Sequence, residues 1–304
     1  MSARRRLLLV VPTLAGLITL VFCFVHLVPG DPVEIMLGEG AAGADAQALR
    51  AALALDRPLP QQFAHFASGL LRGDLGHSIA FRTPVAEVIA ARYPATVELG
   101  VAALLLAVAI GIPLGVLAAT RRGSVLDRCA RATSLLGVCF PSLWLAPVLV
   151  LVFSMQLGWL PVSGRGGIAH LVLPAVSLAL GMLGILVRLT RASVLAVLED
   201  GHVLAARARG APPWLVTWRH AVRTALVPVV TVIGLQAGAL LAGAVVTETI
   251  FAWPGVGRLL VQAIGARDYP LVQGCVLAIG FTYVAVNLGT DLLLARLDPR
   301  LRDE

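Results

Sequence analysis

The sequence predicts an all-α membrane protein with six transmembrane helices, and three observations support this fold class. Of the 304 residues, 58% are hydrophobic and 13% are charged, whereas soluble chains are about 45–50% apolar and about 25% charged. Mean hydropathy is high, at +0.88. Six runs without Asp, Glu or Arg have about the 20 residues that a helix needs to cross a bilayer. This composition excludes a disordered chain and disfavours a soluble enzyme.

The six runs are the predicted spans, in chain order. They comprise residues 7–29, 99–120, 132–164, 166–187, 224–247 and 269–290. The first is too long for the apolar core of a signal peptide, so we interpret it as a membrane anchor. The third is longer than one span needs and contains Pro141 and Pro147. A segment rich in Gly, Pro and Ser at 156–167 predicts a turn before the fourth run.

The arginine distribution predicts that both termini lie in the cytosol. All 24 basic residues are Arg. With the N-terminus inside, the cytosolic segments hold 16 of them and the short outer loops hold 3. Because cytosolic loops are enriched in positive charge, the opposite topology is disfavoured.

The spans divide the chain into four segments. Residues 1–29 are the N-terminal tail and first span, 30–94 an extracytoplasmic helical insert, 95–296 the main transmembrane domain, and 297–304 a cytosolic tail. Within the insert we expect helices over 46–55 and 61–73, and a third that ends before Pro94.

A long cytosolic segment, residues 191–223, has internal helix signals. Residues 202–209 favour a short helix, Gly210 stands where a helix C-terminal glycine belongs, and Pro213 is placed to open a second helix. Trp214, Trp218 and Val222 follow at spacings of four, which predicts one apolar stripe at the membrane boundary. Long ordered loops are usually functional, so we expect this one to dock a partner.

Motifs for several kinds of chemistry are missing from the sequence. Without Lys there is no GxxxxGK[ST] phosphate-binding loop and no Schiff-base lysine. The four Cys residues form no CxxC pair, and neither GxSxG nor HExxH occurs. We therefore predict no catalytic residue, no metal site and no nucleic-acid partner.

Four polar residues within or beside the spans are candidates for the transport pathway, because such residues are costly in a membrane. Glu248, near the outer end of the fifth run, is assigned to an outer gate or a binding-protein contact, with interfacial solvation as the alternative. Asn287 and Asp291 lie four residues apart and are able to face a pore or a neighbouring subunit, although Asp291 could equally be a boundary residue. Gln236 is a pore-lining candidate.

Two further patterns concern helix packing. Gly234 with Gly238, and Gly111 with Gly115, form GxxxG pairs that favour close helix contact. The segment 251–257 contains Pro254-Gly255 and predicts an outer-surface turn, in which Trp253 would join the interfacial aromatic belt.

The segment at 204–210 resembles a known signature. Leu-Ala-Ala-Arg-Ala-Arg-Gly is similar to the form EAA, three residues, G, with Leu204 in place of Glu. RHAVRTALVPVVTVIGLQ follows it, then LLAGAVVTETIFAWPGVGRLLVQAI and RDYPLVQG, and GDLGHSIAFRTPV and RYPATVELG precede it. In order and topology the chain resembles a permease subunit of a bacterial ABC importer of the dipeptide/oligopeptide/nickel family.

The resemblance implies a type I importer permease fold over residues 95–296, in the bacterial cytoplasmic (inner) membrane. It implies four kinds of partner: a second homologous permease, two ATP-binding subunits that hold ATP and Mg, an extracytoplasmic substrate-binding protein, and membrane lipid. This chain would bind no cofactor. Its coupling helix would contact an ATPase subunit through residues around Glu199, Asp200, Ala205, Ala206 and Gly210.

The resemblance also implies short peptides as the solute. Glutathione, a nickel chelate and another small solute remain alternatives within the same architecture. An ATP-independent secondary transporter is a weaker alternative, because no internal repeat is evident and the cytosolic segment would be unexplained.

Overall fold

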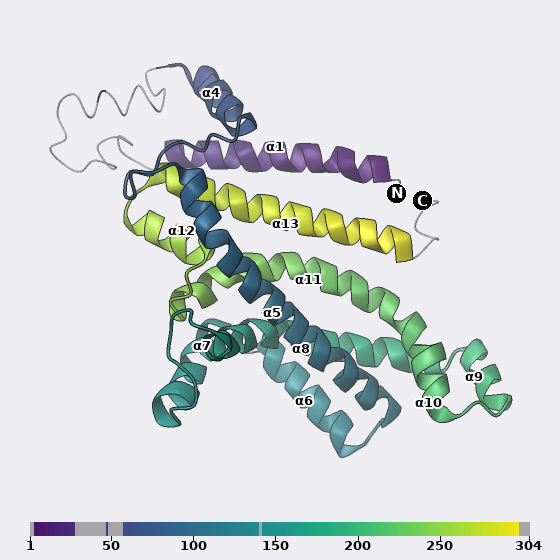
Figure 1. The fold of residues 1–304 in the computed structure, drawn as a ribbon. Helices are drawn as coiled ribbons and strands as arrows, with labels where there is room; N and C mark the ends of the chain where they lie inside the picture. The colour runs from purple at the N-terminus through teal and green to yellow at the C-terminus, as the bar shows by residue number, and fades with distance from the viewer. Residues whose placement is uncertain (1–2, 28–46, 48–56, 140–141, 298–304) are drawn as a thin grey trace.

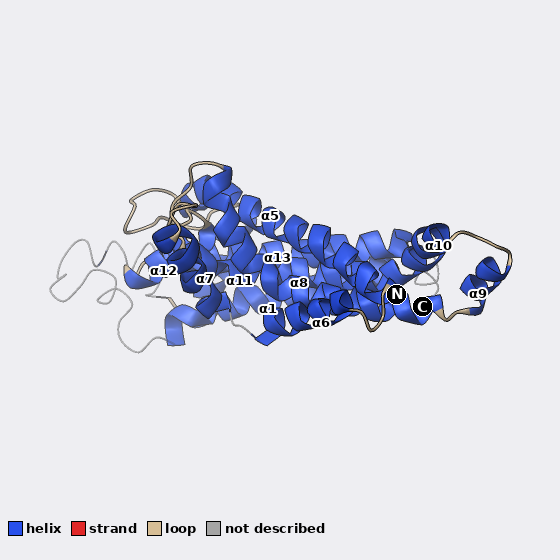
Figure 2. Ribbon diagram, turned by 90° about the horizontal axis from the view of Figure 1, so that it is seen from below, coloured by secondary structure: helices blue, strands red, loops and turns tan. Residues whose placement is uncertain are grey.

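The computed structural model describes residues 3–27, 47, 57–139 and 142–297, and these residues are almost entirely helical (Figures 1 and 2). No β-strand occurs among them; His77 and Pro84 form an isolated bridge. The elements are α1 (Ala3–Leu27), α4 (Leu59–Leu71), α5 (Val85–Thr120), α6 (Val125–Cys139), α7 (Ser142–Leu149), the π-helix η1 (Val150–Gln156), α8 (Ile168–Leu198), α9 (Gly201–Ala208), α10 (Pro213–Leu215), the π-helix η2 (Val216–Val222), α11 (Arg223–Ile250), α12 (Val256–Gly265) and α13 (Tyr269–Leu297).

The long helices form an elongated bundle with two distinct ends (Figures 1 and 2). Helix α9 lies at one end, where α1 begins and α13 ends; we call this the α9 end. Helix α12 lies at the opposite end, the α12 end, which is also the end at which α4 lies (Figure 1).

The main core lies where α5, α8 and α11 meet. Helix α5 makes its most extensive contact with α8, and α11 packs on both α8 and α13. The buried side chains there are aliphatic and small; they include Leu99, Ala103, Ala107, Leu178, Leu186, Val229 and Leu240. Apolar residues on every face of these helices are expected in a membrane protein, because lipid covers the outer faces.

In the described part of the chain, four helices are long and apolar enough to cross a membrane, over Val85–Thr120, Ile168–Leu198, Pro213–Leu240 and Tyr269–Leu292. They contain the predicted second and sixth spans and overlap most of the fourth and fifth. The first and third predicted spans correspond to shorter apolar helices, Val10–Phe24 within α1 and Leu143–Gln156 over α7 and η1.

One predicted helix boundary was wrong. The helix expected to end before Pro94 continues through it as α5, across the predicted segment boundary at 94–95. Ile89, Ala95 and Leu99 are all buried, so tertiary packing on both sides of Pro94 overrides its local preference. The third run, which is longer than one span needs, is covered by parts of α6, α7 and η1 in the described residues.

Helix α4, which belongs to the predicted insert, packs against the bundle. It lies next to α1, where the Phe22 ring meets Phe63 edge-on at 5.3 Å and Phe66 at 5.9 Å between centroids. The helix predicted over 46–55 lies outside the described residues apart from Gln47.

Close helix contacts confirm both GxxxG predictions. A Cβ on Gly115 would lie 2.7 Å from Thr190 Cβ on α8, and one on Gly238 would lie 2.9 Å from the Tyr283 ring on α13. A comparably close contact joins α6 to α8, where a Cβ on Gly184 would lie 2.7 Å from the Ser134 carbonyl oxygen. Glycine allows the backbones to approach at these points.

We expect alanine substitution at two helical glycines to have opposite effects. Gly184→Ala should destabilise the protein by about 1–3 kcal/mol, because its methyl group must displace the α6 backbone. Gly289→Ala should stabilise it by about 0.5–1 kcal/mol, since nothing lies within 4 Å of that position and alanine is the better helix former. Thermal denaturation in detergent measures both, and shifts of the same sign would contradict the packing described for α6 and α8.

Candidate functional site: the coupling segment and the polar residues of the bundle

Helix α9 projects from the bundle on a narrow base (Figures 1 and 2). It follows α8 after two residues, and it contacts the end of α8 and the π-helix η2. Val203 and Ala206 are buried on the bundle side. Leu204 and Ala205 are exposed on the other side. The two predicted alanines therefore differ in their surroundings, because Ala206 is buried within the chain and Ala205 is exposed on the surface.

Gly210 ends α9 as predicted. Its φ is +81°, in the left-handed region that glycine adopts without penalty. The Gly210 N–H donates to the Arg207 carbonyl at 2.9 Å, and the Ala211 N–H donates to the Ala206 carbonyl at 3.2 Å. This pair of bonds is the Schellman arrangement, which satisfies the last carbonyls of the helix and fixes the direction of the chain beyond it.

The two acidic residues before α9 have separate surroundings. Asp200 occupies the N-cap position of α9 without a capping hydrogen bond from its side chain, and its carboxylate lies 3.9 Å from His202 Nδ1. Glu199 instead caps the C-terminus of α8, and its carboxylate lies 3.7 Å from an Arg122 guanidinium nitrogen. Both members of that pair are exposed, so it contributes little stability.

The predicted apolar stripe is only partly formed. Trp214 and Trp218 are 66% and 52% exposed, but Val222 is buried against α5 and α8. The segment Val216–Val222 is a π-helix, whose wider turn means that a spacing of four residues no longer keeps one face. The stripe therefore ends at Trp218.

A cavity of about 500 Å³ is lined by residues of α9, α10 and η2 and of the ends of α5 and α8. Apolar side chains such as Leu195, Leu198 and Val216 form much of its wall, and Glu199 and Arg207 supply opposite charges. Few contacts hold α9 to the bundle, and this cavity lies directly beneath it.

At the α12 end, Glu248 is fully buried and hydrogen-bonded within the chain. Its Oε1 accepts a bond from Thr96 Oγ1 at 2.7 Å, and its Oε2 accepts one from the Arg258 N–H at 3.0 Å. Thr96 Oγ1 also accepts the Val256 N–H at 2.8 Å. Glu248 thus satisfies the free N–H groups at the start of α12 and links α11 to α5. The alternative of interfacial solvation was wrong, because the side chain is 0% exposed.

Trp253 was also predicted wrongly. It is 0% exposed, and its Nε1–H donates to the Ala95 carbonyl at 2.7 Å. The Arg165 guanidinium lies 5.8 Å from its ring and also bonds Glu98 of α5. The turn at 251–257 is therefore held against α5 within the protein, and Trp253 is not part of an interfacial belt.

The remaining polar candidates do not gather at one point. Asn287 faces α11, since a Cβ on Gly238 would lie 3.4 Å from its Nδ2. Gln236 is half-buried, and because Gly234 and Gly238 both face α13, it lies on the other side of α11. Asp291 is exposed near the α9 end.

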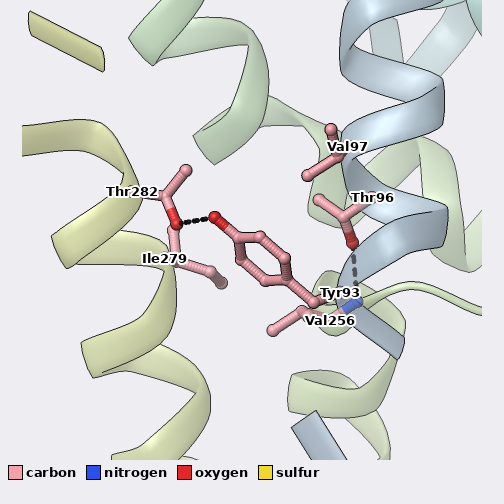
Figure 3. A pocket seen from close by; sticks show the side chains of 6 residues that line it. All are labelled: Tyr93, Thr96, Val97, Val256, Ile279 and Thr282. Carbon is pink, nitrogen blue, oxygen red and sulfur yellow. Dashed lines mark hydrogen bonds between the residues drawn. The ribbon is translucent and has the colours of Figure 1, made fainter. Parts of the chain in front are cut away.

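A small cavity of about 10 Å³ lies between α5, α12 and α13, with room for about one water molecule. Figure 3 shows Tyr93 and Thr282 meeting across it at 2.6 Å between their oxygens. Thr282 Oγ1 donates to the Ala278 carbonyl, so the Tyr93 hydroxyl is the donor in this pair. The bond fastens α5 to α13.

An ion pair that the sequence analysis did not identify joins α6 to α8. Asp127 is 1% exposed; its Oδ1 accepts Arg191 Nε at 2.6 Å, and its Oδ2 accepts Arg191 Nη2 at 3.0 Å. The Gly123 N–H also donates to Oδ2 at 3.0 Å. These bonds hold the pKa of Asp127 down, at about 2, because each favours the ionised carboxylate.

Nothing in the described part of the chain suggests a metal site, since no three His, Cys, Asp or Glu residues cluster there.

Comparison with known families assigns the chain. Residues 111–303 match the family described as "Binding-protein-dependent transport system inner membrane component", and residues 3–100 match its N-terminal counterpart. The chain belongs to this permease family. It is the membrane subunit of an ABC importer and not an enzyme, and it is a multi-pass inner-membrane protein.

Curated relatives of this permease cover nearly the whole chain. The dipeptide transport system permease protein DppB of Escherichia coli K12 is 44% identical over 98% of this chain and 97% of its own. A di/tripeptide permease of Pseudomonas aeruginosa is 41% identical over 99% and 98%. The glutathione transport system permease protein GsiC of Pectobacterium atrosepticum is 41% identical over 98% and 97%.

Solved structures confirm the importer fold of this permease. The MetNI methionine ABC transporter, in an inward-facing conformation, matches with a TM-score of 0.57 and 18% identity, over 69% of this chain and 96% of that one. An amino acid ABC transporter matches with a TM-score of 0.51 and 19% identity, over 70% and 94%.

The conformation of Gly210 predicts a specific pattern of substitutions. Gly210→Val should reduce uptake by the reconstituted importer, because a β-branched residue at positive φ costs at least about 1–2 kcal/mol and distorts the end of α9. Gly210→Asn should be close to wild type, since asparagine tolerates this conformation. No atom outside the neighbouring residues lies within 4 Å of the added Cβ, so the expected effect arises from the backbone conformation of residue 210. Equal uptake by the valine variant and the wild type would contradict the role of the Schellman turn.

The ionised state of Asp127 predicts acid-dependent stability. Since its pKa falls from 3.8 to about 2 on folding, the stabilisation is complete above about pH 5 and is lost as the pH falls towards 2. Melting temperatures of the wild type and Asp127→Asn, measured in detergent from pH 7 to 2.5, should differ most at neutral pH and converge in acid. A difference that does not change with pH would show that the carboxylate charge is unimportant.

Proposed function

We propose that this permease and a second, related permease form the membrane pathway for short peptides delivered by a binding protein. Separate subunits would bind ATP and Mg and hydrolyse the nucleotide. The observation that carries this proposal is the 44% identity to a dipeptide permease over 98% of the chain. The comparable 41% identity to a glutathione permease supports glutathione, itself a tripeptide, as the second candidate.

The geometry of α9 supports its use as the coupling helix. It projects from the bundle, ends in a fixed turn at Gly210, and presents Ala205 among its exposed residues. Small residues allow a partner subunit to approach closely. We assign Ala205 to the ATPase contact, Ala206 and Gly210 to the shape of the helix, and Asp200 to its start. Glu199 would act from the end of α8.

The polar candidates receive different roles in this proposal. Gln236 and Asp291 retain accessible surface, and we assign them to the pathway. Asn287 would act at the contact between α11 and α13. Glu248 would position an outer gate through the turn that it holds, without lining the route itself.

The proposed orientation places the α9 end in the cytosol. The arginine distribution supports this orientation, because 16 Arg lie in segments assigned to the cytosol and 3 in short outer loops. The beginning of α1 and the end of α13 lie at the same end as α9 (Figure 1). Both termini would then be cytosolic.

Reconstitution tests the proposed function. The permease is purified in mild detergent from its native operon, its partners are identified by mass spectrometry, and the complex is placed in liposomes with its binding protein. Labelled dipeptide should accumulate only when ATP and Mg are supplied on the α9 side. Preferential uptake of glutathione would select the second candidate, and uptake without ATP by the chain alone would contradict the ABC importer mechanism.

A further inference from the structure

One side of α6 packs against α8 along its whole described length. Its buried positions are Asp127, Ala130, Ser134 and Gly137, at spacings of three, four and three residues. This spacing places them on a single stripe. Ser134 Oγ donates to the Gly184 carbonyl at 2.7 Å, and a Cβ on Gly137 would lie 2.6 Å from the Leu180 carbonyl. The stripe joins backbone to backbone at mid-helix and ends in the Asp127–Arg191 pair.

That pair is the charged member of the stripe, and its geometry is specific. Two guanidinium nitrogens meet two carboxylate oxygens, which is the bidentate arrangement that fixes orientation as well as distance. Arg131 approaches the same carboxylate at 3.8 Å, but its side chain is 56% exposed. The described groups facing Asp127 are therefore Arg191, the Gly123 N–H, the Ser124 hydroxyl, and the more distant Arg131. The Ser124 hydroxyl accepts a hydrogen bond from the backbone N–H of Asp127.

The position of Arg191 links this pair to the coupling segment. Arg191 lies seven residues before α8 ends at Leu198, and α9 begins three residues later at Gly201. A displacement of α9 would therefore first move the segment of α8 that carries Arg191. The other connection of α9, through η2, leads into α11 and also contacts α8.

We propose that the Asp127–Arg191 pair is a positioning device that makes α6 move together with the α9 end of α8 during the transport cycle. The inference rests on the proposed function, since it assumes that ATPase subunits displace α9. When the pair is intact, a movement of α8 carries α6 and the α5–α6 turn with it. When the pair is broken, α8 moves while the end of α6 lags, so ATP is hydrolysed with less transport.

The first test measures coupling in the reconstituted importer. Asp127→Asn removes the charge and keeps the shape, and Arg191→Lys keeps the charge but loses the bidentate contact. Arg131→Gln is the matched control, because it removes a nearby positive charge and leaves the pair intact. For each protein, substrate-stimulated ATP hydrolysis and peptide uptake are measured in the same liposomes.

We expect both variants of the pair to hydrolyse ATP at close to the wild-type rate while peptide transported per ATP falls about 2- to 30-fold, the usual range for altered coupling between sites. The control should keep the wild-type ratio. If uptake and hydrolysis fall in proportion, the pair only stabilises the fold and the inference is wrong. An unchanged ratio in both variants would also overturn it.

The second test does not depend on the stability of these variants. Spin labels are attached at Arg128→Cys on α6 and Ala192→Cys on α8, both exposed positions, in a chain whose 4 native cysteines are replaced by alanine. The distance between the labels should be the same in the nucleotide-free and ATP-trapped importer. A distance that changes with nucleotide would overturn the inference, whereas a wild type without ATP-driven uptake would instead contradict the proposed function.

Discussion

The close packing of other helices around α8 is the constraint on which the rest of the structure depends. In the most apolar 18-residue stretch of each long helix, the share buried within this chain is 61% for α8 and 28–33% for the other three helices. Lipid tails are as apolar as leucine, so helices in a membrane associate through packing and hydrogen bonds more than through the hydrophobic effect. Small residues such as Gly115 and Gly184 meet that requirement. The less buried helices leave surfaces for lipid and for a second subunit.

A second constraint operates at the α12 end, where a buried carboxylate must find donors. Glu248 finds them in a side chain of α5 and in the N–H groups that begin α12. Leaving either side unsatisfied in a medium without water would be costly. The position of the carboxylate therefore fixes how α11 turns into α12 and how both meet α5. Tyr93 and Thr282 extend the same connection to α13 (Figure 3).

The sequence predicted the features that depend on local signals. Charge-free runs located the long helices, and Gly210 with Pro213 located the end of α9 and the start of α10. Features that depend on distant partners were missed or misassigned. Pro94 lies inside a helix because both flanking segments are packed, and Trp253 is buried because the Ala95 carbonyl, 158 positions away, accepts its N–H. The Asp127–Arg191 pair spans 64 positions, and the only local trace of it is the stripe of small residues that follows Asp127.

The two faces of α9 explain why the signature tolerates its one clear departure. The signature has Glu where this chain has Leu204, which is 50% exposed on the outer side of the helix. The bundle-facing positions, Val203 and Ala206, are buried. The fold of this chain therefore does not require a carboxylate at position 204. An ATPase subunit that contacts this side of α9, as proposed, would meet an apolar side chain at position 204 in place of a carboxylate.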